Sequence, residues 1–546
     1  MGFPPPPYDG SRAPQVALID RHMHQAWRQS DLEPSPAASD RKWCRRVHLD
    51  VIGRIPTVAE LNAFLDDRSA DKKARLVAKL LGETDERYAG EYASHWATVW
   101  TNILIGRTGG TGDDSLTSRA GMHTYLREQF RRNAPYDRLV RELITATGAT
   151  RPQDEGFNGA TNFLVTKLAD DAVQATAKTA QIFLGLQVQC TQCHNHPFND
   201  WKQNQFWELN AFFRQARALR RFEGGNRAVS AELIDQDFAG ESNEPAEADV
   251  FFEMRNGLVK VAYPAFVDGT SLVDLHGAEL GNSGYVSDVN RRQELGKLLI
   301  ESRWLDKAIV NRMWAHFLGY GFTKPPDDMG PHNPPSHPEL LDALGSEFRA
   351  SGFDLKQLIR WIALSEPYAL ASRTTRHNES DDPTIGARPQ FSRFYLRPMQ
   401  AEQLYESLLV ATRADRVDSE TSEAQIETRR RWLSQFTRAF GTDDGGETTT
   451  FNGTIPQTLM MMNGELVRKA TELEPGNLLY DVLSNSKMSD REQIEHLYLA
   501  ALSRPPTRDE IGQANKLVAL RGGNRAEALA DVFWALLNSN EFILIH

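Results

Sequence analysis

The chain has 546 residues, too many for one hydrophobic core, and this length predicts roughly three or four domains of ordinary size. Apolar residues make up 40% of the sequence and charged residues 25%, which is typical of a folded globular protein rather than a disordered one. The net charge of -11 argues against nucleic acid as a partner, because neutralising phosphates needs a concentrated basic surface. No stretch approaches the roughly 20 apolar residues of a membrane-spanning helix.

The N-terminal residues predict a linker followed by helices. Residues 1–15 are rich in proline and lack the basic and apolar regions of a signal peptide, so we expect a linker in front of a folded domain. Apolar residues recur at helical spacing over 16–29 and 35–49, with Asp40 as a candidate N-cap of the second helix. Residues 57–60 have the threonine-to-glutamate spacing of a capping box and predict the start of another helix.

Helical periodicity continues through the rest of this half of the chain. Apolar side chains recur at i, i+3 and i+4 over 71–81, 88–105, 122–133, 136–147 and 169–186. The last of these segments leads directly into a cysteine motif. We therefore expect that motif at the end of a helix.

The composition changes between the two helical halves. Two apolar runs, 249–253 and 258–262, are separated by Asn256-Gly257, which predicts a β-hairpin. We expect a small β-containing connection over 221–290. The arginine-rich run 217–221 just before it is expected to be a solvated helix face.

The C-terminal half again predicts helices. They span 291–300, 305–318, 338–350, 355–365, 399–411, 491–503, 509–519 and 526–537. Ser336 before Pro338 and the capping box 507–510 indicate helix starts. No internal repeat of fixed period is found. The sequence predicts a mainly α, multi-domain architecture with a linker at 1–15, a helical domain at 16–220, the β-containing connection at 221–290 and a second helical domain at 291–546.

Two of the three cysteines stand in the run Cys190-Thr191-Gln192-Cys193-His194. With three cysteines and 14 histidines in 546 residues, chance would produce this pattern on the order of 0.0004 times. C-x-x-C-H is the spacing of c-type haem attachment, in which both thiols bind the macrocycle and the histidine is the proximal iron ligand. One covalent haem c on Cys190, Cys193 and His194 is the leading prediction, and it implies assembly outside the cytoplasm.

Other uses of the same residues remain open. Both thiolates with His194 and His196 would form a tetrahedral zinc set, although adjacent Cys193 and His194 make that geometry awkward. A redox dithiol usually follows a strand, and here a helix is expected. A plain disulfide is the third alternative. Cys44 is expected to be a lone buried thiol.

The haem hypothesis raises the question of the sixth iron position. A protein ligand there favours electron transfer, and an open position favours small-molecule chemistry. Candidate distal or pocket residues are His95, Met122, His123, Arg312, His316, His332 and His337. His196 is a candidate cofactor-binding residue as a haem-propionate partner, and Asp327-Asp328 beside His332 is a candidate loop for a metal or a sugar hydroxyl.

Motifs in both halves carry a family resemblance. In the first half they are residues 45–50, Gly53, Pro56-Thr57, His95-Trp96, 133–137, 183–185, 190–197 and Trp201; in the second half they are 311–317, Gly319, Gly321, 333–341, 364–368, 397–404, 456–463 and 504–507. With these residues the chain resembles the planctomycete-type cytochrome proteins built from the domains DUF1549 (PSCyt2) and DUF1553 (PSD1). The resemblance implies a haem protein that is periplasmic or otherwise exported, with its targeting or anchor segment outside this sequence.

We therefore expect an extracytoplasmic c-type haem oxidoreductase acting on an unknown small-molecule or carbohydrate-derived substrate, with a protein as electron donor or acceptor. The carbohydrate is implied by the bacterial setting of the family and by no residue of this chain. One alternative is a non-enzymatic electron-transfer or surface-assembly protein. The other is a metal-dependent hydrolase that uses the Cys/His cluster or the Asp327-Asp328 loop. The catalytic residues are not predicted.

Overall fold

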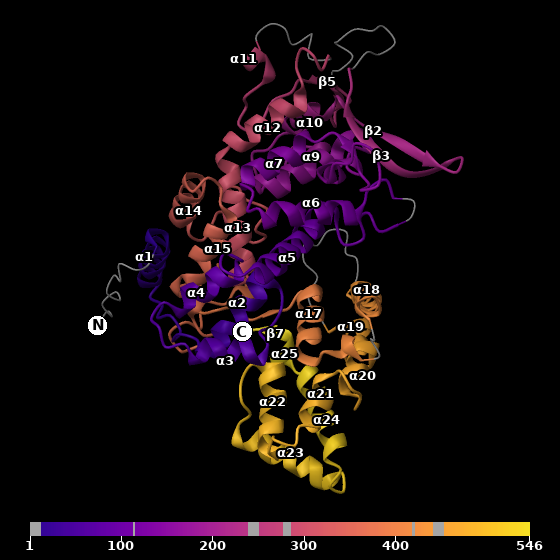
Figure 1. Ribbon diagram of the computed structural model, residues 1–546. Helices are drawn as coiled ribbons and strands as arrows, with labels where there is room; N and C mark the ends of the chain where they lie inside the picture. Colours follow the sequence, from indigo (N-terminus) through magenta and orange to yellow (C-terminus); the bar gives the residue numbers. More distant parts are fainter. Residues whose placement is uncertain (1–12, 113–114, 238–249, 277–284, 418–420, 441–452) are drawn as a thin grey trace. The chain divides into compact units, whose positions relative to one another are not determined.

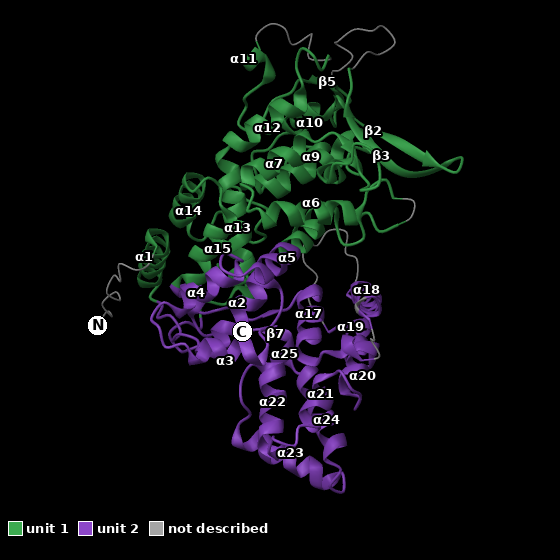
Figure 2. Ribbon diagram, in the orientation of Figure 1, with its two compact units in different colours: residues 1–31, 96–365, 380–390 green, residues 32–95, 366–379, 391–546 purple. Residues whose placement is uncertain are grey.

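The computed structural model of the chain (Figure 1) describes residues 13–112, 115–237, 250–276, 285–417, 421–440 and 453–546. The chain divides into two compact units (Figure 2). Unit 1 comprises 1–31, 96–365 and 380–390, and unit 2 comprises 32–95, 366–379 and 391–546. Each unit thus combines residues from both halves of the chain. The domain boundaries proposed along the sequence stay a prediction.

Unit 1 is mainly helical. Its helices are α1 (Pro14–Gln29), the second half of α5 (Glu86–Ile105), α6 (Arg119–Arg131), α7 (Tyr136–Thr145), α8 (Asn162–Val165), α9 (Val173–Thr179), α10 (Gln203–Asn210), α11 (Leu272–His276), α12 (Arg291–Glu301), α13 (Arg303–Leu318), α14 (Pro338–Ala350) and α15 (Leu355–Leu364). Helix α7 packs on α12, and α13 packs on α14 and α15. This confirms the mainly α class.

Two small sheets complete unit 1. Strands β1 (Gly148–Ala149), β2 (Ala216–Glu223) and β3 (Arg227–Asp235) form an antiparallel sheet in the order β1-β3-β2. Strands β4 (Val250–Glu253) and β5 (Val259–Ala262) form the hairpin predicted around Asn256-Gly257, with Val250 opposite Ala262. The arginine run 217–221 lies on β2, so its prediction as a helix face was wrong. Pairing with the distant strand β3 overrides the local pattern.

The predicted helix 169–186 is interrupted. Asp170, Asp171 and Ala172 have φ angles of 51°, 54° and 59°, in the left-handed region that breaks an α-helix. Helix α9 follows, then a π-helical turn, η3 (Ala180–Leu184), which ends at Gly185 with a φ of 66°. The cysteine motif therefore does not end a helix. It lies on a separate 3-10 turn, η4 (Gln189–Gln192).

Unit 2 contains the remaining helices. They are α2 (Asp40–Ile52), α3 (Val58–Asp66), α4 (Lys72–Leu80), the first half of α5, α16 (Glu366–Ala369), α17 (Ala401–Thr412), α18 (Ser422–Ala439), α19 (Ile455–Asn463), α20 (Glu465–Thr471), α21 (Leu478–Leu483), α22 (Asp490–Leu502), α23 (Arg508–Leu520), α24 (Arg525–Leu537) and α25 (Asn540–Ile543). Strands β6 (Arg397–Pro398) and β7 (Leu544–Ile545) pair antiparallel. Helices α18 to α21 were missing from the sequence-based prediction.

One predicted N-cap was wrong, and a second helix starts where predicted but without a cap from its preceding serine. Asp40 is the first residue of α2, and the N-cap is Ser39, whose side chain accepts from the backbone N–H of Lys42. Helix α14 begins at Pro338 as expected, but Ser336 does not cap it. The Ser336 hydroxyl instead bonds Nδ1 of His337 at 2.8 Å. A hydroxyl near a helix start thus caps it only when the backbone brings it over the first free N–H groups.

Unit 2 holds the same local structure twice. A helix ends at a residue with left-handed backbone, Gly53 (φ 76°) after α2 and Ser503 (φ 57°) after α22. An arginine comes next, and a capping box then starts α3 or α23. The two copies are not recognisable as a repeat in the sequence, because few of the remaining side chains agree between them.

In both copies the arginine grips the capping-box glutamate and a second glutamate. Arg54 donates to both carboxylate oxygens of Glu60 at 2.9 Å and, through Nε, to Glu91 at 2.6 Å. We call this set clamp 1. Clamp 2 consists of Arg504, which donates to Glu510 at 2.8 and 2.9 Å and to Glu541 at 2.6 Å, with Glu510 and Glu541 themselves.

Candidate functional site

The cysteine motif forms a short exposed turn in unit 1. Cys190 and Cys193 are both exposed and both free thiols. The backbone N–H and the hydroxyl of Thr191 both donate to the carbonyl of Val188, at 2.9 and 2.6 Å, and so fix the turn. Cys190 lies on this turn, Cys193 is its C-cap, and both thiols reach solvent.

The orientation of His194 follows from one hydrogen bond. Its Nδ1 lies 2.7 Å from the backbone carbonyl oxygen of Asn195. A carbonyl oxygen only accepts, so Nδ1 carries the proton and donates it. The lone pair of the neutral ring is then on Nε2. This is how proteins commonly orient a metal-binding histidine, with the second ring nitrogen held by a backbone or carboxylate oxygen.

Helix α10 supports the turn from one side. The side-chain amide of Gln203 and the indole N–H of Trp207 both donate to the carbonyl oxygen of Gln192, at 3.2 and 3.1 Å. The side-chain oxygen of Asn195 accepts from the backbone N–H of Gln203 at 3.0 Å. The turn is thus attached to the start of a helix, although its cysteine side chains are exposed.

A loop from the second half of the chain, residues 325–333, attaches to the segment that precedes the turn. Buried Asp327 accepts from the side-chain amides of Gln181, at 2.6 Å, and Gln187, at 3.2 Å. The backbone N–H of Met329 donates to the carbonyl of Gly185 at 2.7 Å. An added Cβ at position 185 would lie 2.6 Å from the terminal carbon of Met329, a flexible side chain that can move away. Glycine is therefore favoured there by its positive φ of 66°.

The same loop brings His332 to His196. Their ring centroids are 5.5 Å apart, and Nε2 of His332 lies 3.1 Å from the carboxylate of Asp328. Nδ1 of His196 accepts from the backbone N–H groups of Phe198 and Asn199, at 3.2 and 3.1 Å. Nε2 of neutral His196 therefore carries the proton. Burial, and next the charge of His332, lower the pKa of His196.

Among the seven predicted distal or pocket residues, His332 lies beside the motif through its contact with His196. Arg312 is buried, which lowers its pKa, and the charge of Asp327 in the loop partly offsets this effect. Sequence reasoning did not identify Gln181 and Gln187. No local pattern marks them, because their partner Asp327 is distant in the chain.

The other predicted residues belong to packing elsewhere. Met122 is fully buried, Nε2 of His123 lies 3.2 Å from the hydroxyl of Thr98, and the ring of His316 packs on Trp96 at 4.9 Å between centroids. His337 bonds Ser336 and packs on Phe322; burial lowers its pKa to about 4. His95 belongs to unit 2, where its ring fills the space beside Gly53.

The described residues contain no metal-binding cluster. Within the described ranges, no three His, Cys, Asp or Glu side chains gather as they would around a metal ion. The four-ligand zinc alternative therefore has no assembled donor set there. No helix in the described part of the chain is long and apolar enough to cross a membrane.

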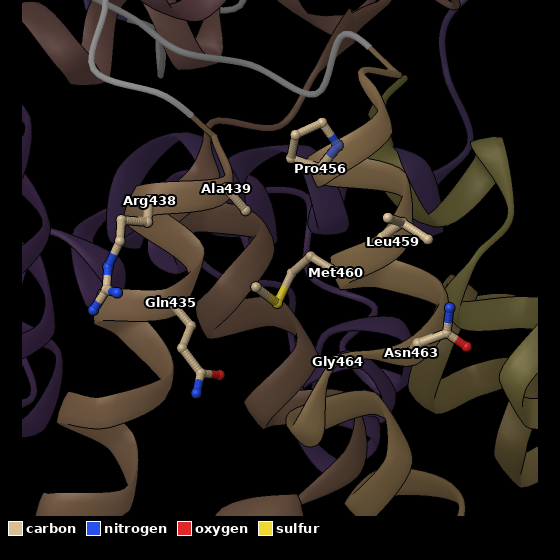
Figure 3. Close-up of a pocket in the computed structure, with 8 residues that line it drawn as sticks. All are labelled: Gln435, Arg438, Ala439, Pro456, Leu459, Met460, Asn463 and Gly464. Atoms are coloured by element: carbon tan, nitrogen blue, oxygen red, sulfur yellow. The ribbon is translucent and has the colours of Figure 1, made fainter.

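A hollow in unit 2 is a weaker candidate. It measures about 480 Å³ and lies between α18 and α19 (Figure 3). Met460 and Leu459 supply apolar surface, and Arg438 is its one charged lining residue among those described. Nothing in its lining resembles a nucleophile, an acid–base pair or a metal ligand set.

Comparison with known proteins assigns the chain to two families. Residues 18–218 match PSCyt2, described as a protein of unknown function (DUF1549). Residues 291–518 match PSD1, described as a protein of unknown function (DUF1553). No curated protein and no solved structure matched the chain. The cysteine turn lies in the first matched region and the loop 325–333 in the second, and the chain belongs to the proteins that combine a PSCyt2 (DUF1549) domain with a PSD1 (DUF1553) domain.

Proposed function

We propose that this protein is a c-type haem protein that takes part in oxidation–reduction outside the cytoplasm. One observation carries the proposal: two exposed free thiols stand at a short turn directly before a histidine whose Nδ1 donates to a backbone carbonyl, so that Nε2 holds the lone pair of the neutral ring. Covalent haem attachment requires two accessible thiols and a neighbouring imidazole with a free lone pair.

Each residue of the turn has a distinct role in this proposal. Cys190 and Cys193 would hold the macrocycle through thioether bonds, and Nε2 of His194 would be the proximal ligand. The hydrogen bond from His194 to the Asn195 carbonyl fixes the ring plane, and α10 fixes the turn. When bound, haem supplies one-electron chemistry at iron; the protein supplies orientation and shielding.

The exposure of the cysteine turn bears on whether such a haem would carry electrons or catalyse a reaction. The side chain of Phe198 is 77% exposed, and both cysteines are exposed as well. A haem held by so exposed a turn would be accessible to a partner protein, which favours the second candidate, a non-catalytic electron carrier. Binding of cyanide to the loaded protein would instead favour an oxidoreductase with an open iron position.

The first experiment is a pyridine haemochrome spectrum with an intact mass, on protein exported from cells that carry the c-type maturation machinery. We expect one covalent haem per chain. The double variant Cys190→Ala/Cys193→Ala should lose it, and the matched variant Cys44→Ala should keep it, because Cys44 is fully buried in unit 2.

Two results would overturn the proposal. One is an exported, folded protein without haem. The other is a double variant that retains the cofactor. Zinc found at one equivalent in place of haem would transfer support to the hydrolase alternative.

A further inference from the structure

The loop 325–333 contacts the chain on both sides of the cysteine turn. Before the turn it bonds the segment 181–187 through Asp327 and Met329, and after the turn it packs on His196. The turn lies in the region that matches PSCyt2, and the loop lies in the region that matches PSD1. The second matched region therefore supplies contacts to the segments that lead into and out of the turn.

The loop has its own support on α13. The side-chain amide of Asn311, which is fully buried, donates to the hydroxyl of Thr323 at 2.7 Å and to the carbonyl of Pro326 at 2.8 Å. The side-chain oxygen of Asn311 accepts from the backbone N–H of Phe322 at 2.6 Å. These bonds fix the start of the loop on a helix of its own matched region.

Asp327 holds two points of the segment before the turn. One carboxylate oxygen accepts from the Gln181 amide and the other from the Gln187 amide, and the side chain is only 7% exposed. Hydrogen bonds to a carboxylate are stronger than those between neutral groups. Burial lowers the pKa of Lys178 and of Arg312, and the charge of Asp327 acts in the opposite direction on both. The buried carboxylate is therefore balanced by cations as well as by its hydrogen bonds.

The two ends of the cysteine turn are attached to different elements. On the Cys193 side, α10 bonds the carbonyl of Gln192. On the Cys190 side, the chain leads back to Gln187, which Asp327 holds. Displacement of either attachment would therefore shift one thiol relative to the other.

We propose that Asp327 is a positioning residue: it sets where the Cys190 thiol lies relative to that of Cys193. It acts through the two glutamines that it holds, Gln181 and Gln187. The inference rests on the proposed function, because both thiols must reach one macrocycle. It adds that the region matching PSD1 takes part in the site through this carboxylate.

The test measures the placement of the thiols without haem. Phenylarsine oxide forms two As–S bonds with neighbouring thiols and releases water, so its affinity for the reduced, haem-free full chain reports how Cys190 and Cys193 are placed. We expect tight binding to the unaltered protein. Asp327→Asn has one oxygen for two amide donors and should weaken binding about tenfold, the factor typical of a lost hydrogen bond to a charged group.

Two glutamine variants separate positioning from general damage to the fold. Gln187→Leu removes one of the two amides and should weaken binding, whereas Gln189→Leu, beside Cys190 but exposed, should leave it unchanged. The loss in the double variant Asp327→Asn/Gln187→Leu should be smaller than the two single losses added, because both remove the same contact. Iodoacetamide, which needs only one thiol, should react equally fast with all variants. If Asp327→Asn does not fold, Gln187→Leu carries the test, because Gln187 is half-buried.

Three results would overturn the proposal. They are equal affinity of phenylarsine oxide for the unaltered protein, Asp327→Asn and Gln187→Leu; additive losses in the double variant; and no binding to the unaltered protein. The haem experiment fails separately: an exported, folded chain without haem removes the proposed function, whereas the arsenical affinities still decide whether Asp327 positions the thiols.

Discussion

Clamps 1 and 2 have the same hydrogen-bond pattern and different surroundings. The Arg54 side chain is 8% exposed and that of Glu60 12%, against 27% for Arg504 and 30% for Glu510. Their bond lengths are nearly identical. The comparison teaches that a local motif fixes geometry, whereas burial decides how much that geometry contributes to stability.

Electrostatics shows the same contrast. Burial alone would raise the pKa of Glu60, but the hydrogen bonds and charge of Arg54 outweigh it and hold that pKa far below its ordinary value. The hydrogen bonds of Arg504 lower the pKa of Glu510 to about 2. In clamp 1 the ion pair must also offset the loss of hydration, so removal of one partner is more damaging there.

The largest effect is expected for Arg54→Ala. The substitution removes the arginine that bonds both oxygens of the buried Glu60 carboxylate and leaves it with the exposed Arg87 at 3.4 Å; loss of a buried partner typically costs about 3–5 kcal/mol. Urea denaturation followed by circular dichroism would measure the loss in the free energy of unfolding. Arg75→Ala is the matched control, because Arg75 pairs with Asp67 at the surface of the same unit; it should cost at most about 1 kcal/mol.

A smaller loss is expected from the residue that precedes clamp 1. Gly53→Ala puts a side chain at a φ of 76° and places its Cβ 2.3 Å from Nδ1 of His95. We expect a cost of roughly 2 kcal/mol, from the left-handed backbone and the steric conflict together. Gly512→Ala, in the interior of α23 with open space around it, should instead stabilise by about 0.5–1 kcal/mol. Thermal melts in which Gly53→Ala and Gly512→Ala both lose stability would contradict this expectation.

Arg504→Ala sharpens the comparison directly. Clamp 2 is partly solvated, so water replaces much of what the arginine provides, and we expect a loss of about 1 kcal/mol. The same denaturation experiment checks it. If Arg504→Ala cost as much as Arg54→Ala, burial would not be what sets the contribution of each clamp to stability.

The smallest expected effect is a change in how the unfolding free energy of Arg504→Ala depends on pH. The folded-state pKa of Glu510 lies below its ordinary value of 4.5, so its contribution is present above that value and is lost as the pH falls toward about 2. Arg504→Ala removes the main cause of the shift. Between roughly pH 5 and pH 2 the unfolding free energy of this variant should therefore fall less steeply than that of the unaltered protein. Parallel profiles in acid denaturation would count against the assignment.

The sequence predicted those parts of the clamps whose residues are only a few positions apart in the chain. Both capping boxes were predicted because Thr57 and Glu60, like Thr507 and Glu510, are three residues apart. The third members, Glu91 and Glu541, each join from 37 residues away. A helix start is thus readable from local residues, whereas its tertiary partner is not.

The candidate site divides in the same way. The sequence predicted a site from the order and spacing of Cys190, Cys193 and His194; in the structure Cys190 lies on η4, Cys193 is its C-cap and His194 follows directly. The sequence did not predict the breaks on either side of α9, because the left-handed residues there include Asp171 and Ala172 rather than glycine alone. His332 was one of seven candidates, since only the fold shows which histidine the loop 325–333 brings to His196.

The proton of His194 is held by a main-chain oxygen, and this has a consequence for how the turn can change over generations. A carboxylate in that place would be lost by a single substitution and neutralised in acid. The acceptor at Asn195 is a backbone carbonyl, which every amino acid has and which does not titrate. A substitution of Asn195 can therefore remove the side-chain hydrogen bond to α10 without removing the carbonyl that sets the tautomer of the His194 ring.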